Sequence, residues 1–227
     1  MALTVGMLLF GSMTQLDLTG PYEVFSRMPD TNVVLLAPRL DWIQSEYGLR
    51  IMPDCALDGA PALNVLFVPG GRGVSAVIRD EGILRFLRER AESALYVTSV
   101  CTGALVLGAA GLLRGYRATT HWLSLDLLSL VGAIPCSERI VIDRNRITAG
   151  GVTAGIDFGL TIAAEICGRK AAERIQLMLE YSPRPPFDSG SPATADAELV
   201  DSVRLNGRAQ SIHEERKSLL SQLPGLR

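Results

Sequence analysis

The chain has 227 residues, of which 48% are apolar and 20% charged, and its formal net charge is −2. This composition is typical of a compact soluble enzyme, and it argues against a general nucleic-acid binder, which would carry a basic stripe. No apolar run reaches the length of a membrane span, and we expect the apolar start to be a strand instead of a signal peptide. The four cysteines are widely spaced without a C-x-x-C pair, so we expect reduced thiols in a cytoplasmic protein.

The first part of the chain alternates apolar, strand-like runs with segments whose apolar residues have helical spacing. In chain order we expect a strand over residues 2–10, a helix over 17–28, a strand over 32–37, a short hairpin or edge strand within 47–57, a strand over 64–68, a helix over 81–91 and a strand over 95–100. Continuous apolar runs of this kind are typical of parallel strands that are buried on both faces.

The second part continues this alternation and then changes character. We expect a helix after residue 101, a hairpin formed by 139–143 and 146–148, helices over 153–167 and 170–181, a loop or surface arm up to 192, and one polar amphipathic helix over 195–220. Strands that alternate with helices predict an α/β protein with a doubly wound sheet. We therefore place one α/β domain at residues 1–192 and a helical extension, packed on or beside it, at 193–227.

Cys101 lies where a strand-like run ends and a run of small, helix-compatible residues begins. Ser99 and Gly103 stand two residues to either side, and they supply the small flanks of a nucleophile elbow, which is a strand, a sharp turn and a helix. The dipole and N–H groups of the following helix would favour the reactive thiolate. A lone cysteine is usually a buried structural residue, but this context predicts a nucleophile. Three other cysteines lack the context: Cys55, Cys136 and Cys167.

Two further features lie at expected carboxyl ends of strands, where doubly wound sheets bind their ligands. Asp17 is either a helix N-cap or a partly desolvated general acid/base among leucines, and the sequence favours neither interpretation. Gly70 and Gly71 form either a turn that needs a positive φ or a donor site aimed at the substrate of the cysteine. In the second case their N–H would join that of Thr102 in a pocket for developing negative charge.

The remaining candidates have plainer interpretations. His121 either approaches the thiol or serves the structure, and two histidines with scattered thiols give no spacing for a metal site. The Pro-Gly-Gly-Arg-Gly turn at 69–73 lacks the lysine and the spacing of a nucleotide loop, so we expect neither a metal nor a cofactor. Gly150 and Gly151 are expected to form an ordinary strand-to-helix turn, and a hinge there is the weaker hypothesis.

Several motifs together resemble the ThiJ/PfpI superfamily. They are the acid motif at 15–21 (Gln-Leu-Asp-Leu-Thr-Gly-Pro), the turn at 69–71, the elbow at 97–103 (Val-Thr-Ser-Val-Cys-Thr-Gly), the stretch at 118–122 (Ala-Thr-Thr-His-Trp), and the segments 105–115, 153–158, 179–183 and 185–187. The likeness runs from the first strand to about residue 192, and the acid motif with Cys101 and Thr102 is more specific to the isocyanide hydratase group. This resemblance implies a flavodoxin-like fold of the class I glutamine amidotransferase-like type.

By position, the resemblance implies Cys101 as nucleophile, Asp17 as its acid/base partner, Thr102 as an active-site neighbour, and Gly71 and Thr102 as backbone donors. It implies hydration of an isocyanide to an N-substituted formamide through a covalent thioimidate, by a homodimer without nucleic-acid or membrane partners. Many members have a glutamate where this chain has Asp17, and the protease branch has a histidine directly after the cysteine. Thr102 at that position argues against peptidase activity.

The residues leave three rival functions open. A glyoxalase-like or deglycase-like enzyme for small aldehydes would use the same cysteine–acid pair equally well. A redox sensor would use an oxidisable Cys101, because an exposed thiol of low pKa readily forms sulfinic acid. A ligand-sensing domain of the kind fused to AraC-like DNA-binding regions shares the Thr-Thr-His-Trp stretch, but the chain beyond residue 192 is short and not basic enough to favour DNA.

Overall fold

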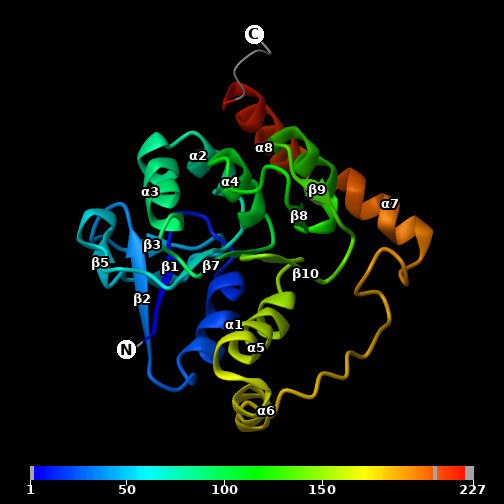
Figure 1. Ribbon diagram of the computed structural model, residues 1–227. Coiled ribbons are helices and arrows are strands. Elements are labelled where there is room, and N and C mark those ends of the chain that lie inside the picture. Colours follow the sequence, from blue (N-terminus) through cyan, green and yellow to red (C-terminus); the bar gives the residue numbers. More distant parts are fainter. Residues whose placement is uncertain (1–2, 207–208, 223–227) are drawn as a thin grey trace.

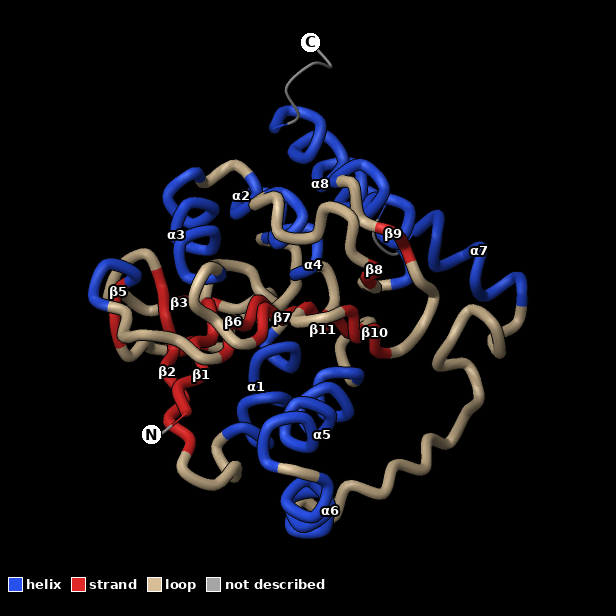
Figure 2. Tube along the Cα trace, viewed as in Figure 1, coloured by secondary structure: helices blue, strands red, loops and turns tan. Residues whose placement is uncertain are grey.

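The computed structural model describes residues 3–206 and 209–222, and a seven-stranded sheet crosses its centre (Figures 1 and 2). The strands in spatial order are β10 (Ile140–Asp143), β11 (Arg146–Ala149), β7 (Tyr96–Val100), β6 (Val65–Val68), β1 (Leu3–Leu8), β2 (Thr31–Ala37) and β5 (Cys55–Ala56). β10 pairs antiparallel with β11, and the other neighbours pair in parallel. This confirms the predicted doubly wound, flavodoxin-like α/β fold.

Helices cover both faces of the sheet (Figure 1). One face carries α1 (Gln15–Phe25), α5 (Ala154–Cys167) and α6 (Arg169–Met178), and the other carries α2 (Val74–Ile78), α3 (Glu81–Ala91), α4 (Gly103–Ala109) and α8 (Ala209–Gln222). The chain moves outward from β1 to β2 and then returns to β6 on the other side of β1. Such a reversal opens a crevice at the carboxyl ends of the strands, which is where ligands bind in this class of sheet.

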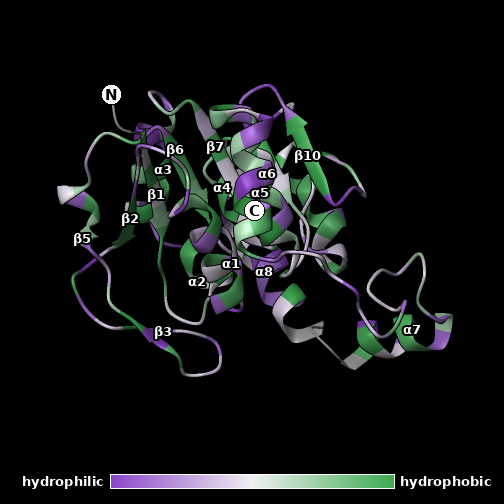
Figure 3. Cartoon of the chain, turned by 90° about the horizontal axis from the view of Figure 1, so that it is seen from below, coloured by the Kyte–Doolittle hydropathy of each residue, from purple (hydrophilic) through white to green (hydrophobic). Residues whose placement is uncertain are grey.

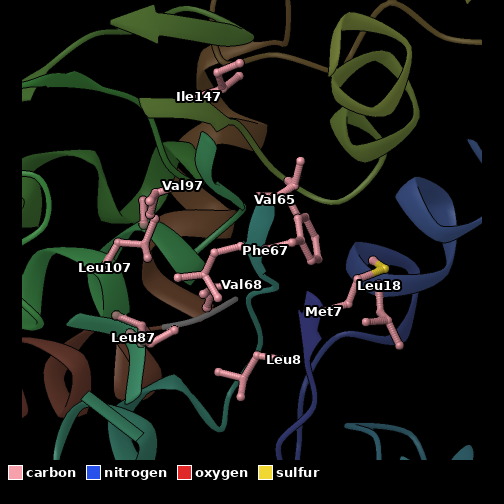
Figure 4. Close-up of a cluster of buried hydrophobic side chains, with 14 of the residues drawn as sticks. Met7, Leu8, Leu18, Val65, Phe67, Val68, Leu87, Val97, Leu107 and Ile147 are labelled. Carbon is pink, nitrogen blue, oxygen red and sulfur yellow. The ribbon is translucent and has the colours of Figure 1, made fainter. Parts of the chain in front are cut away.

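The core is built from alternate residues of the strands, which face opposite helical layers. Met7 of β1 lies beside Leu18 of α1, whereas Leu87 and Leu107 come from helices of the other layer (Figure 4). Three buried rings form a cluster with centroids 5.7 to 6.2 Å apart, in which Phe25 meets Phe67 and Phe158 edge-on and the latter two are tilted by 40°. Aromatic pairs in this geometry contribute roughly 0.5–1.5 kcal/mol each beyond the area that they bury.

Several short elements escaped the sequence analysis. The range 47–57, expected to hold a short hairpin or edge strand, contains β4 (Arg50–Ile51) and β5, which forms the edge of the main sheet, whereas β3 (Ile43–Gln44), the hairpin partner of β4, lies before that range. The helix α2, the 3₁₀ helix η2 (Trp122–Val131) and the strands β8 (Arg117–Ala118) and β9 (Ile134–Pro135) were not expected. Elements of two to ten residues are too short for a clear hydrophobic period. Ala2, included in the first expected strand, lies outside the described residues.

The terminal helix expected over residues 195–220 includes residues 207–208, which lie outside the described residues, so its continuity stays a prediction. The described residues of this region are helical, as α7 (Ala197–Asn206) and α8 (Figure 1). α8 packs against α2, α4 and η2, with Leu219 buried. The division of the chain into 1–192 and 193–227 stays a prediction. No helix within the described residues is both long and apolar enough to cross a membrane.

Candidate active site

The strand, sharp turn and helix predicted around Cys101 are all present. β7 ends at Val100, α4 begins at Gly103, and Cys101 between them has a φ of 52°. A non-glycine residue in this left-handed region is strained and is most often found at turns and functional sites. Its N–H donates to the carbonyl oxygens of Ala149 and Gly150, both at 3.0 Å, and its own carbonyl accepts from Thr120 Oγ1 at 2.7 Å.

The small residue after the turn has a steric reason. A Cβ on Gly103 would stand 2.2 Å from the carbonyl oxygen of Val68 and 2.7 Å from that of Pro69. Both distances are far below van der Waals contact, and both oxygens belong to the backbone at the end of β6. Gly103 therefore lets α4 start directly against the neighbouring strand, which brings the turn at 69–71 next to Cys101.

We expect Gly103→Ala to destabilise the protein by about 1–3 kcal/mol, or roughly 2–10 °C in melting temperature, because the new methyl group forces the elbow away from β6. Thermal unfolding of the purified variant measures this shift. Gly59→Ala is the matched control, since nothing lies within 4 Å of a Cβ at Gly59. Equal melting temperatures for the two variants would contradict the steric explanation.

Asp17 is fully buried and lies in the first turn of α1. Its Oδ2 accepts a hydrogen bond of 2.9 Å from the N–H of Gly70. The N-cap interpretation of Asp17 is wrong, because α1 begins at Gln15 and Thr14 holds the N-cap position. The structure instead places the carboxyl group against the turn that follows β6. A buried carboxyl in that place fits the general acid/base alternative.

Gly70 and Gly71 lie between Asp17 and the elbow. Gly71 has a φ of 133°, which confirms a turn that needs a positive φ. A Cβ on Gly70 would stand 2.5 Å from the backbone nitrogen of Thr102 and 2.9 Å from Asp17 Oδ2, so those two groups flank the same glycine. The N–H of Gly71 donates to Thr102 Oγ1 at 3.1 Å. The predicted donor residues are thus gathered in one place, together with the acid.

A cavity of about 380 Å³ lies beside the elbow. Thr120 and Gly150, which both bond the backbone of Cys101, are among its lining residues, and so are His121, Ser191 and Pro192. His121 Nδ1 accepts from the N–H of Leu123 at 3.3 Å, so this histidine caps η2 and also lines the cavity. Thr120 and the arm at 190–192 were not predicted at the site, because both lie far from Cys101 in the sequence.

Gly150 and Gly151 sit in an ordinary strand-to-helix connection. The N–H of Gly150 donates to the carbonyl of Arg139 at 2.9 Å. A Cβ on Gly151 would stand 2.6 Å from Cδ2 of His121, so close approach of this ring explains the glycine. The connection thereby joins the elbow, the cavity and η2. The weaker hypothesis of a hinge stays a prediction.

Among the described residues, the other cysteines and the acidic side chains form no second candidate site like the one at Cys101. Burial raises the pKa of the Cys55 and Cys167 thiols, with smaller contributions from nearby aspartates, so both are expected to be protonated at neutral pH. Cys136 accepts a hydrogen bond from Arg117 Nε at 3.3 Å. Over residues 3–206 and 209–222, no three histidine, cysteine, aspartate or glutamate side chains are grouped as a metal site would require.

The chain is similar to known proteins over nearly its whole length. The isonitrile hydratase of Pseudomonas putida is 54% identical over 204 residues, which cover 90% of each protein. The crystal structure of a ThiJ/PfpI family protein from Pseudomonas syringae superposes with a TM-score of 0.94 at 42% identity, covering 96% of this chain and 91% of that one. The predicted resemblance to the ThiJ/PfpI superfamily is therefore confirmed.

A more distant match concerns the ligand-sensing alternative. The HTH-type transcriptional regulator GbdR of Pseudomonas aeruginosa is 36% identical over 136 residues, but the match covers 59% of this chain and 37% of the regulator. Most of that regulator thus lies outside the similarity. The sequence pattern of the DJ-1/PfpI family matches residues 4–165, across β1, the turn after β6, the elbow and most of α5. The chain belongs to the DJ-1/PfpI family.

Proposed function

We propose that this protein is a cysteine-dependent carbon–nitrogen hydro-lyase that hydrates isocyanides to N-substituted formamides. The observation that carries the proposal is the arrangement in which Asp17 and the backbone nitrogen of Thr102 flank Gly70, next to a strained Cys101. The similarity to a protein named isonitrile hydratase, over 90% of both chains, supports the choice of substrate. Peptidase chemistry is disfavoured because Thr102 stands where that branch of the superfamily has a histidine.

In the first step, the sulfur of Cys101 forms a bond to the terminal carbon of the isocyanide, R–N≡C. The proton from the thiol passes through Asp17 to the same carbon, and the product is a thioimidate, R–N=CH–S–Cys101. A nucleophile held at an elbow and one adjacent acid/base are sufficient for this addition. The strained turn at Cys101 fixes the backbone that carries the thiol.

In the second step, Asp17 takes a proton from water while the water oxygen forms a bond to the thioimidate carbon. The nitrogen gains that proton, the carbon–sulfur bond breaks, and the remaining hydroxyl proton passes to the departing sulfur, so the products are R–NH–CHO and the regenerated thiol. Negative charge develops during both additions, and backbone N–H donors would stabilise it. We assign this role to Thr102 directly and to Gly71 through Thr102. Since the Gly71 N–H donates to Thr102 Oγ1, it polarises that hydroxyl group, whose own hydrogen can then be offered to the reacting atoms.

Production of formamide by the wild-type protein tests the proposal. The protein is incubated separately with an alkyl isocyanide, an aryl isocyanide and methylglyoxal, and NMR follows each substrate and product. We expect stoichiometric N-substituted formamide from at least one isocyanide. Conversion of methylglyoxal without any formamide would move the assignment to the aldehyde chemistry that the same cysteine–acid pair allows. If neither substrate reacts while Cys101 oxidises readily, the redox sensor would replace both.

We also propose that two copies of the chain form a homodimer, with a small-molecule isocyanide and water as the reactants. Large apolar side chains around the β3–β4 hairpin support this, since Trp42 is 62% and Tyr47 83% exposed. An exposed apolar cluster of this kind is typical of protein contacts. Light scattering is expected to give twice the mass of one chain, and a monomer mass at micromolar concentration would contradict the dimer.

A further inference from the structure

The carboxylate of Glu46 links the two loops that build the site. Glu46 lies in the turn between β3 and β4, and its side chain is only 10% exposed. Glu46 Oε2 accepts a hydrogen bond from Thr14 Oγ1 at 2.9 Å, and Oε1 pairs with Arg72 Nε at 2.6 Å. The two oxygens therefore reach two segments that are far apart in the sequence.

Each partner of Glu46 is a near neighbour of a proposed site residue. Thr14 directly precedes α1, whose first turn carries Asp17, and Arg72 directly follows Gly71. Thr14 stands at the N-cap position, where a threonine hydroxyl normally accepts from the first N–H groups of the helix. No such cap bond forms here, and the hydroxyl donates to Glu46 instead. Thr14 therefore bonds the β3–β4 hairpin in place of the stabilising cap bond to its own helix.

Backbone hydrogen bonds also align the start of α1, the β3–β4 hairpin and the turn after β6. Met13 and Gly71 form an isolated antiparallel bridge, and the N–H of Thr14 donates to the carbonyl of Gly70 at 2.9 Å. The N–H of Glu46 donates to the carbonyl of Met13 at 2.9 Å, which fixes the hairpin on that bridge. Figure 3 shows this hairpin projecting at one side of the molecule. A partly buried ion pair between segments that are already aligned loses little entropy when it forms, so it can set their separation closely.

We propose that Glu46 is a positioning residue, which holds the start of α1 and the turn after Gly71 so that the Asp17 carboxyl faces the Cys101 thiol. The inference rests on the proposed function for its kinetic readout, but the placement of Asp17 beside the thiol can be measured without it. Glu46 itself does not touch the reacting atoms. Its effect is exerted through Thr14 and Arg72.

The test compares Glu46→Ala and Glu46→Gln with the wild type in isocyanide turnover. Glu46→Ala is expected to lower kcat about tenfold while KM changes less than about twofold, because a displaced acid/base slows the chemical steps more than it weakens binding. Glu46→Gln is expected to lie between, since it can accept from Thr14 but cannot pair with Arg72 as an ion. Glu173→Ala, which breaks an exposed ion pair with Arg169 on α6, is the matched control and should leave kcat unchanged.

A second measurement separates this inference from the hydratase assignment. The rate at which iodoacetamide alkylates Cys101 is followed against pH by peptide mass spectrometry, which needs no isocyanide. Glu46→Ala is expected to move this pH profile, whereas Glu173→Ala is not. A moved profile without any wild-type isocyanide turnover would refute the hydratase proposal and support the positioning role. A lower melting temperature with unchanged kcat and unchanged alkylation profile would overturn the positioning role, because Glu46 would then serve stability alone.

Discussion

Replacing Cys101 with serine is expected to lower kcat/KM for isocyanide hydration by at least about a thousandfold, since enzymes that lose their nucleophile fall at least this far. A serine hydroxyl is almost entirely protonated at neutral pH, whereas a thiol at a helix N-terminus has an accessible thiolate. The substitution is nearly isosteric, so the strained turn and its bonds to Ala149, Gly150 and Thr120 should persist. Formamide production by NMR, with circular dichroism to verify folding, measures the effect.

The remaining thiols provide controls for this experiment. Burial raises the pKa of Cys55 and Cys167, and Cys136 accepts a hydrogen bond from an arginine at the surface. Serine at any of these three positions should therefore leave kcat/KM within about twofold of the wild type, as expected for substitutions away from the reacting atoms. Near-normal turnover by Cys101→Ser would refute covalent catalysis by this residue.

The elbow could be predicted because its signal is local. Ser99 and Gly103 are small, the preceding run is apolar, and the following residues favour a helix. Every nearby residue therefore favours the same local structure, a strand followed by a turn and a helix. The reason for Gly103 is less local, since the oxygens that a Cβ would meet belong to Val68 and Pro69 in another strand. The sequence thus indicated the feature, while the contact that enforces it is visible only in the folded chain.

The role of Asp17 could not be decided from the sequence for the same reason. Its N-cap and acid/base interpretations differ in a contact with Gly70, which lies 53 positions away. Glu46 was missed altogether, because it lies just before the range expected to hold a hairpin and its bonds to Thr14 and Arg72 have no sequence pattern. Long-range contacts of polar side chains, unlike the periods of strands and helices, leave no regular spacing to detect.

Asp17→Asn is expected to lower kcat for isocyanide hydration by about 10²- to 10⁴-fold, the range typical of a lost general acid/base. The amide oxygen of asparagine can still accept from the N–H of Gly70, so the local geometry is preserved while proton transfer is lost. The proposed mechanism uses that proton transfer in both additions, and the attack by water depends on it most, because a thiol ionises far more readily than water. Steady-state kinetics measures the loss, with Asp126→Asn, an exposed position on η2, as the matched control.

The two steps respond differently to this substitution, which makes the prediction specific. An asparagine cannot deprotonate water, so any thioimidate that forms on Cys101 in the variant should be hydrolysed slowly and accumulate. Intact-mass spectrometry of Asp17→Asn after mixing with isocyanide is then expected to show the protein plus one substrate, and Cys101→Ser to show no adduct. A variant with full turnover would remove Asp17 from the mechanism. Lost turnover without any adduct would assign Asp17 to the first addition, because the carbon–sulfur bond would not have formed.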